Sequence, residues 1–366
     1  MINVTKSFLP PLKEYISYLE GIWERSHLTN HGPLVLELEQ RIKDYLGVKH
    51  FYFVNNGTTA LLIAIKAADL NGEVITTPFS YVATTSSLVW EGCKPVFADI
   101  KSGCFTISPK SIKEKLTDKT VAILATHVYG NPCDVEAIED IAKENNLKVI
   151  YDAAHAFGVH YKNKSVLNFG DISTLSFHAT KLFHTIEGGG IVTSDDELAH
   201  RISYMRNFGH NGPEHFFGVG INGKGSEFQA AMGLCLLPRM DEIIESRKSI
   251  CDRYMKNLID LPLEFLQIQK GTTLYNYAYF PVVFETEAQL LRIVDVLREN
   301  QIIPRRSFYP SLNTLSYVEN NLTDSISDSV SHRVLCLPLY PELRFDEVDA
   351  ISTIIRKTIL EEISGK

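Results

Sequence analysis

The sequence is poor in the features that mark several large classes of protein. Among its 366 residues there are only six cysteines and two tryptophans. The cysteines lie far apart and form no Cys-x-x-Cys pair, which excludes the common zinc frameworks and does not resemble a disulfide scaffold. We therefore expect reduced thiols in a cytoplasmic protein.

Long apolar runs and an excess of basic residues are also missing. No apolar run reaches membrane-spanning length, and the N-terminal residues contain no apolar stretch after a basic start, so we expect no membrane partner. The formal net charge is −8, and basic pairs such as Arg305-Arg306 are isolated. Because nucleic-acid backbones are bound by clustered Lys and Arg, we expect no nucleic-acid partner.

The composition is that of a globular protein, with 45% hydrophobic and 22% charged residues. Short apolar runs that suit strands occur at 51–54, 74–76, 95–97, 121–124 and 148–151. Helical patterns at 80–90, 108–116 and 135–145 separate the later runs. This alternation predicts an α/β fold in which helices cover both faces of a mostly parallel sheet.

The character of the sequence changes beyond residue 225. A helix is predicted at 228–236 and a long amphipathic one at 240–258, followed by a strand at 279–284 and helices at 287–299 and 345–362. A chain of this length suits two domains. We predict a large domain over 1–240, with an N-terminal helical segment, and a smaller α+β domain over 241–366.

A lysine in an unusual setting is the most informative feature of the sequence. Lys181 lies in the run SFHATKLFHTIEGGG (176–190), between small hydroxylated residues and a glycine string. About thirty residues upstream, Asp152 follows an apolar run and precedes two alanines and His155. This pattern favours a lysine that forms a Schiff base with pyridoxal phosphate (PLP), with the aspartate as partner of the cofactor's ring nitrogen.

Other residues suit the rest of such a cofactor. The segment NNGTTA (55–60) stands where a strand passes into a helix, so backbone amides there attract an anion. Gly57 permits close approach of a phosphate, and the hydroxyls of Thr58, Thr59 and Ser176 can add hydrogen bonds. A helix-capping threonine explains the same segment. It is not a Walker loop, and no Gly-x-Gly-x-x-Gly motif favours a nicotinamide-dependent dehydrogenase.

Two further residues have both a functional and a structural interpretation. Tyr81 follows a strand and can stack on an aromatic cofactor ring or pack in the core. His155 can bond the cofactor's phenolic oxygen or be a buried core histidine. His178 and His184 lack a third ligand at a suitable spacing, so we expect no metal.

These segments together resemble the DegT/DnrJ/EryC1/StrS family of PLP-dependent sugar aminotransferases. The matching pieces run along most of the chain and include LTNHGP (28–33), NGTTAL (56–61), PVFADI (95–100), HVYG (127–130), DAAH (152–155), SFHATK (176–181), EGGG (187–190) and LCLPLY (335–340). The resemblance implies an aspartate-aminotransferase-like (fold type I) architecture with a seven-stranded sheet.

The resemblance also implies roles for individual residues. Lys181 and Asp152 are the catalytic pair, Tyr81 and His155 face the cofactor, and the phosphate positions fall on Gly57, Thr58 and Ser176. The family's Gly-x-Asn-x-Arg segment matches GINGK (220–224). Its asparagine, here Asn222, reaches the phosphate of the neighbouring subunit, which implies a homodimer with shared active sites.

Lys224 stands where the family usually has arginine, and a lysine cannot form the planar fork of an arginine, which puts a bidentate role in doubt. For the nucleotide sugar, the expected contacts are Thr29, Lys224, Arg305, Arg306 and Tyr309.

Within the family, the opening segment is most similar to enzymes that form dTDP-4-amino-4,6-dideoxyglucose for bacterial surface polysaccharides such as O-antigen. The expected substrates are L-glutamate and dTDP-4-keto-6-deoxyglucose. Amination at carbon 3 is the close alternative, and the sequence does not distinguish the nucleotide, the hexose or the stereochemistry. A related dehydratase carries histidine in place of Lys181. A non-catalytic protein of this fold is expected to lose Lys181 or Asp152.

Overall fold

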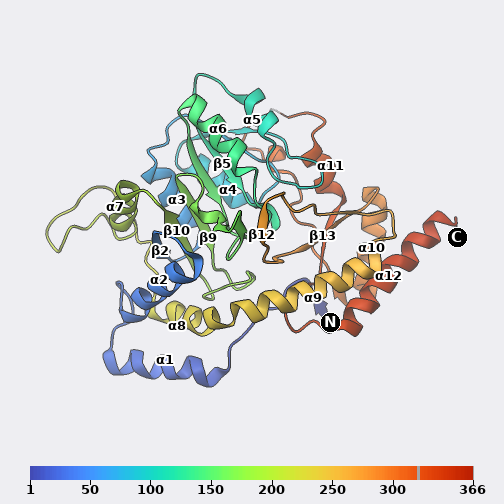
Figure 1. Ribbon diagram of the computed structural model, residues 1–366, viewed down its shortest axis with the longest axis horizontal. Helices are drawn as coiled ribbons and strands as arrows, with labels where there is room; N and C mark the ends of the chain where they lie inside the picture. The colour runs from blue at the N-terminus through green and yellow to red at the C-terminus, as the bar shows by residue number, and fades with distance from the viewer. Residues whose placement is uncertain (320–321, 366) are drawn as a thin grey trace.

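The centre of the computed structural model, which describes residues 1–319 and 322–365, is a seven-stranded sheet (Figure 1). In spatial order the strands are β2 (His50–Val54), β10 (Gly189–Thr193), β9 (Ile172–Ser176), β6 (Lys148–Asp152), β5 (Thr120–Thr126), β3 (Glu73–Thr76) and β4 (Lys94–Phe97). β10 is antiparallel to both of its neighbours and all other pairs are parallel. The other six strands therefore end at the same edge, which confirms the predicted mostly parallel sheet.

Helices cover both faces of this sheet, because successive residues of each buried strand point to opposite sides. In β5, Ile123 and Ala125 pack into one apolar cluster, whereas Ala122 and Leu124 pack into another. The helices of this part are α1 (Leu12–Arg25), α2 (Pro33–Leu46), α3 (Gly57–Ala67), α4 (Val82–Trp90), α5 (Pro109–Lys115), α6 (Val135–Asn145), α7 (Asp196–Met205) and α8 (Glu227–Leu236). The helix expected to follow the strand, within residues 55–60, begins at Gly57, because the side chain of Asn56 caps it.

A separate apolar cluster lies in the C-terminal part of the chain. The long helix α9 (Met240–Leu258) runs to it from α8 and packs against α12 (Phe345–Ile363) (Figure 1). Beside them lie an antiparallel sheet of β11 (Glu264–Phe265), β13 (Phe280–Val283) and β15 (Val334–Leu337), and the helices α10 (Glu287–Glu299) and α11 (Ile326–Arg333). The helices predicted at 240–258 and 287–299 are thereby confirmed. The domain division at residue 240 stays a prediction.

Segments far apart in the sequence join the two parts. β1 (Ile2–Asn3) pairs with β14 (Ile302–Ile303), and β12 (Thr272–Leu274) pairs with β7 (His160–Tyr161), which also pairs with β8 (Lys164–Ser165). The hydroxyl of Ser7 donates to the carbonyl of Ala179 at 2.7 Å, and the ring of His184 bonds the carbonyl of Phe8 at 2.8 Å. Short 3-10 turns lie at Val128–Gly130, Val166–Asn168, Leu237–Arg239 and Leu312–Thr314. The N-terminal segment therefore ties the C-terminal part to the loop that carries Lys181.

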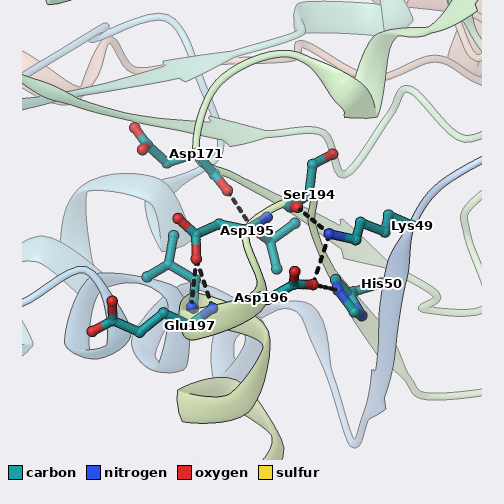
Figure 2. A network of polar contacts seen from close by, with 9 residues as sticks. Lys49, His50, Asp171, Ser194, Asp195, Asp196 and Glu197 are labelled. Atoms are coloured by element: carbon teal, nitrogen blue, oxygen red, sulfur yellow. Dashed lines mark hydrogen bonds and ion pairs between the residues drawn. The ribbon is translucent and has the colours of Figure 1, made fainter.

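The opposite edge of the sheet is held by a separate polar network (Figure 2). The carboxylate of Asp196 accepts from the Lys49 amine and the His50 ring, both at 2.7 Å, and Asp195 caps the start of α7. His50 begins β2, so this network is a full strand away from the edge where β2 ends. Among the described residues, no helix combines the length and the apolar character needed to cross a membrane.

Candidate active site

The predicted site residues meet at the edge where the parallel strands end. Asp152 is the last residue of β6 and Ser176 the last of β9, while Gly57 and Tyr81 follow the ends of β2 and β3. Lys181 follows Ser176 in the loop between β9 and β10. Open α/β sheets bind ligands beyond the carboxyl ends of their strands, so this edge is the candidate active site.

The start of α3 forms a cradle that suits an anion. The Asn56 side chain accepts from the backbone N–H of Thr59 at 2.8 Å. The N–H groups of Gly57 and Thr58 precede the first helical hydrogen bond and are free to bind a ligand. A Cβ on Gly57 would lie 2.8 Å from the Cβ of Ser176, so only glycine permits this approach. Thr58 is exposed and Thr59 is buried, which leaves the hydroxyls of Thr58 and Ser176 for a phosphate.

Asp152 supplies a buried carboxylate. One oxygen accepts from the hydroxyl of Thr84 at 2.7 Å and the other from the backbone N–H of Ala154 at 3.1 Å. Burial raises the pKa of Asp152, and the hydrogen bonds from Thr84 and Ala154 and the charge of Lys181 act against that rise. A buried carboxylate whose ionisation is disfavoured suits a cationic partner, and a protonated pyridine nitrogen is one.

Lys181 projects from a loop whose shape is fixed by hydrogen bonds. Its backbone N–H donates to the carbonyl of His178 at 2.8 Å, and its amine lies 3.5 Å from the hydroxyl of Tyr279. Lys181 and Tyr279 line a pocket together with His155 and Ser176. The rings of His178 and His184 bond within or next to this loop, to Thr180 and to the Phe8 carbonyl. Among the described residues, no group of three or more His, Cys, Asp or Glu could hold a metal ion.

His155 is held beside the lysine by an aromatic cluster. Its Nδ1 accepts from the backbone N–H of Tyr129 at 3.3 Å, and its ring lies parallel to that of Phe308, with the centroids 5.7 Å apart. Burial, followed by the charges of Lys181 and Arg305, holds its pKa well below the usual value. Because Nδ1 accepts a hydrogen bond, the ring proton belongs on Nε2, which can donate to a ligand.

Tyr81 lies at the start of α4 with 55% of its surface exposed. Tyr81 is therefore not packed in the core, which was one of the two interpretations of this residue. An aromatic face so exposed at the ligand edge is free to cover a planar ring.

The two adjacent arginines are placed differently. Arg306 forms an ion pair with Glu287 at 2.6 Å, and its guanidinium lies 3.5 Å from the ring centroid of Tyr309. Arg305 is exposed, and its charge reaches His155. Of this pair, Arg305 is therefore the residue available to a ligand of the Lys181 pocket.

The remaining predicted residues lie near the ends of β2 and α1. The amine of Lys224 donates to the side-chain oxygen of Asn222 at 2.8 Å and lies 4.5 Å from the ring centroid of Phe208. Asn55 bonds the backbone of this segment, with its N–H 2.9 Å from the carbonyl of Gly223. Thr29 is exposed in the turn before α2. Among the described residues, none of these side chains forms a hydrogen bond or ion pair with Lys181 or Asp152 of the same chain.

Three contact residues were missed by the sequence reasoning: Thr84, Tyr279 and Phe308. Tyr279 and Phe308 come from the C-terminal part and contact the lysine and His155. Nothing local distinguishes them from core aromatics. Thr84 could have been found from the sequence, because it lies in the first turn of the helix that follows a strand, at the edge of the sheet where ligands bind.

The donor set as a whole fits PLP. Free amides and two hydroxyls could bind a phosphate, a buried carboxylate could pair with the ring nitrogen, and an amine lies in the pocket beside a histidine that could donate a hydrogen bond. Each of these groups is on the same edge of the sheet, as a single small cofactor requires.

Known proteins are similar to this chain over almost its full length. Residues 12–356 match the DegT/DnrJ/EryC1/StrS aminotransferase family. The chain is 43% identical to a dTDP-4-amino-4,6-dideoxy-D-glucose transaminase of Shigella dysenteriae and 39% identical to one of Escherichia coli, covering 97% of this chain and 98% of each relative. A crystal structure of DesI in the presence of its TDP-sugar product has a TM-score of 0.92 and 30% identity, covering 100% of this chain and 95% of DesI. The chain therefore belongs to the DegT/DnrJ/EryC1/StrS family of PLP-dependent aminotransferases, as its sequence motifs predicted.

Proposed function

We propose that the protein transfers the amino group of L-glutamate to carbon 4 of dTDP-4-keto-6-deoxyglucose and so forms dTDP-4-amino-4,6-dideoxyglucose. The observation that carries this proposal is the complete set of Lys181, Asp152 and the α3 cradle in a chain 43% identical to a transaminase named for this product. The amino sugar would serve surface polysaccharides such as O-antigen. The six cysteines are all free, which suits a reducing cytoplasm.

The residues of the site have different roles in such a transfer. PLP supplies an aldehyde and an electron-withdrawing ring. Asp152 would keep the ring nitrogen protonated, because a cation stabilises its buried carboxylate. The α3 amides and the hydroxyls of Thr58 and Ser176 would hold the phosphate. Lys181 accepts a proton from the carbon that bears the amino group of the donor and returns one to carbon 4 of the sugar.

The overall balance needs no further reactant. Glutamate gives up its amino group and leaves as 2-oxoglutarate, and the sugar ketone takes up that amino group and becomes an amine. One amine and one ketone are consumed and one of each is formed.

A second copy of the chain would complete the site. In the part of the chain that the structure describes, the side chains of Asn222, Lys224 and Thr29 form no hydrogen bond or ion pair with Lys181. We therefore propose that they serve the site of a partner in a homodimer. The charge of Arg305 acts on His155 of its own chain, so Arg305 is the candidate for binding an anionic part of a substrate.

The test is a reaction with purified protein, glutamate and a panel of dTDP-, UDP- and GDP-linked keto sugars. Product NMR should show nitrogen at carbon 4 of the dTDP sugar. Nitrogen at carbon 3 would refute the regiochemistry, and no amination of any sugar would refute the function. Lys181→Ala should retain the cofactor without turnover, and full turnover of that variant would remove the lysine from the mechanism.

Mixed dimers test whether the site is shared. Lys181→Ala and Asn222→Ala proteins, each of low activity alone, are unfolded together and refolded. Heterodimers then contain one site with both wild-type residues, so about a quarter of all sites should recover. Recovery should not occur if Asn222 serves its own chain, because every site would then carry one lesion.

A further inference from the structure

Four buried oxygen atoms form an unbroken row that ends on Asp152. The hydroxyl oxygens of Thr126 and Ser80 are 3.0 Å apart, those of Ser80 and Thr84 are 2.7 Å apart, and Thr84 lies 2.7 Å from Oδ2 of Asp152. The four side chains are at most 5% exposed. They come from the ends of β5 and β6 and from the segment that begins α4, so three elements converge on one carboxylate.

The protons of this row can be arranged in only one way when Asp152 is ionised. A carboxylate has no proton to give, so Thr84 must donate to it. Each hydroxyl carries one proton, and Thr84 has used its own, so Ser80 must donate to Thr84. By the same count, Thr126 must donate to Ser80. All three hydroxyl dipoles therefore point toward Asp152, and such aligned bonds strengthen one another.

We propose that Ser80, Thr84 and Thr126 are positioning residues that hold Asp152 ionised and oriented for the cofactor's ring nitrogen. The row occupies Oδ2, and the backbone N–H of Ala154 occupies one side of Oδ1. Each carboxylate oxygen can accept two hydrogen bonds, so either Oδ1 or Oδ2 can still accept one from the ring nitrogen of the cofactor. The proposal rests on Asp152 being the partner of that nitrogen.

Thr85 provides a matched control. It follows Thr84 in α4 and is fully buried, but its hydroxyl has no hydrogen-bond partner. A threonine-to-valine change at residue 85 keeps the shape of the side chain and breaks no hydrogen bond. Any general effect of removing a buried hydroxyl from α4 is therefore measured at residue 85.

The experiment measures the dissociation constant of PLP by titrating the apoprotein and following visible absorbance, which needs no sugar substrate. Thr84→Val should weaken PLP binding by about tenfold or more, because a hydrogen bond to a charged group is lost. Thr126→Val, which never touches Asp152, should weaken it by a smaller factor of about two to five. Thr84→Ser should restore wild-type affinity, and Thr85→Val should not change it.

Steady-state kinetics supply a second readout that a purely structural role would not produce. Thr84→Val should lower kcat with little change in KM for the sugar, since the row acts through the cofactor and not on substrate binding. Ser80→Ala removes the middle hydroxyl but leaves the bond from Thr84 to Asp152, so, like Thr126→Val, it should have a smaller effect than Thr84→Val. Wild-type PLP affinity in both Thr84→Val and Ser80→Ala would overturn the proposal, as would equal losses in Thr84→Val and Thr85→Val. Failure of the wild-type protein to bind PLP would instead refute the cofactor assignment.

Discussion

Replacing Gly57 by alanine tests the phosphate cradle directly. The new Cβ would lie 2.8 Å from the Cβ, 3.1 Å from the Oγ and 3.2 Å from the Cα of Ser176. Real Cβ atoms do not approach others so closely, and two of these neighbours are stiff parts of β9. The start of α3 must therefore move away from Ser176.

The cost of this movement can be bounded. Forcing one extra methyl group into a packed interior costs about 1–3 kcal/mol. If the displacement is relieved only by opening the cradle, PLP binding weakens by a similar free energy, or about 5- to 150-fold in the dissociation constant. Titration of apoprotein with PLP gives the affinity, and urea unfolding of the apoprotein separates the loss of stability from the loss of binding.

Two further variants make the result interpretable. Gly218→Ala is the control, because its Cβ would meet only Tyr204 at 3.6 Å or more, an ordinary contact. Ser176→Gly removes the opposing Cβ, so the apoprotein carrying Gly57→Ala and Ser176→Gly should be more stable than the two single effects predict by addition. Unchanged PLP affinity in Gly57→Ala would refute the close cradle.

Three other changes have expected outcomes. Asp152→Asn should raise the melting temperature of the apoprotein at neutral pH, because a buried carboxyl whose pKa is raised opposes folding above that pKa. Calorimetry should show that this rise in melting temperature vanishes below the ordinary carboxyl pKa. Glu227→Gln should lower the free energy of unfolding in urea by about 1–3 kcal/mol, because the buried carboxylate accepts from two backbone N–H groups at the start of α2. Lys49 and His50, which contact Asp196 (Figure 2), lower the pKa of its carboxyl. The stability that Asp196 contributes is therefore present above the ordinary carboxyl pKa and is lost as the pH falls through the lowered pKa. In that pH range, Asp196→Asn should make the free energy of unfolding depend less on pH.

Much of the fold could be predicted because local rules and tertiary packing agree. The pattern of residues 240–258 and 287–299 gives both helices with their observed bounds. Ser108 and Pro109 mark the start of α5, where the serine side chain accepts from the backbone N–H of Ser111. The strand ends gave the positions of Asp152 and Ser176 because a parallel sheet brings its carboxyl ends to one edge.

What the sequence could not provide depends on contacts between distant segments. The hydroxyl of Tyr279 meets the Lys181 amine across 98 positions of sequence. Phe308 stacks on His155 from the C-terminal part. Nor does the dipeptide Arg305-Arg306 show which guanidinium is free, since that depends on Glu287 reaching Arg306 from α10. Such pairings are set by the packing of whole elements and leave no local signal.

The pairing of β1 with β14 bears on how the chain reaches its folded state. Ile2 pairs with Ile302, so this contact joins two segments about 300 positions apart in the sequence. Loops this long close slowly, and the contact forms only after most of the chain exists. Until then the N-terminal segment lacks β14 as its anchor, although Ser7 and Phe8 hold the lysine loop through Ala179 and His184. We therefore expect the pairing of β1 with β14 to be a late step of folding, and this step anchors the segment whose Ser7 and Phe8 contact the loop that carries Lys181.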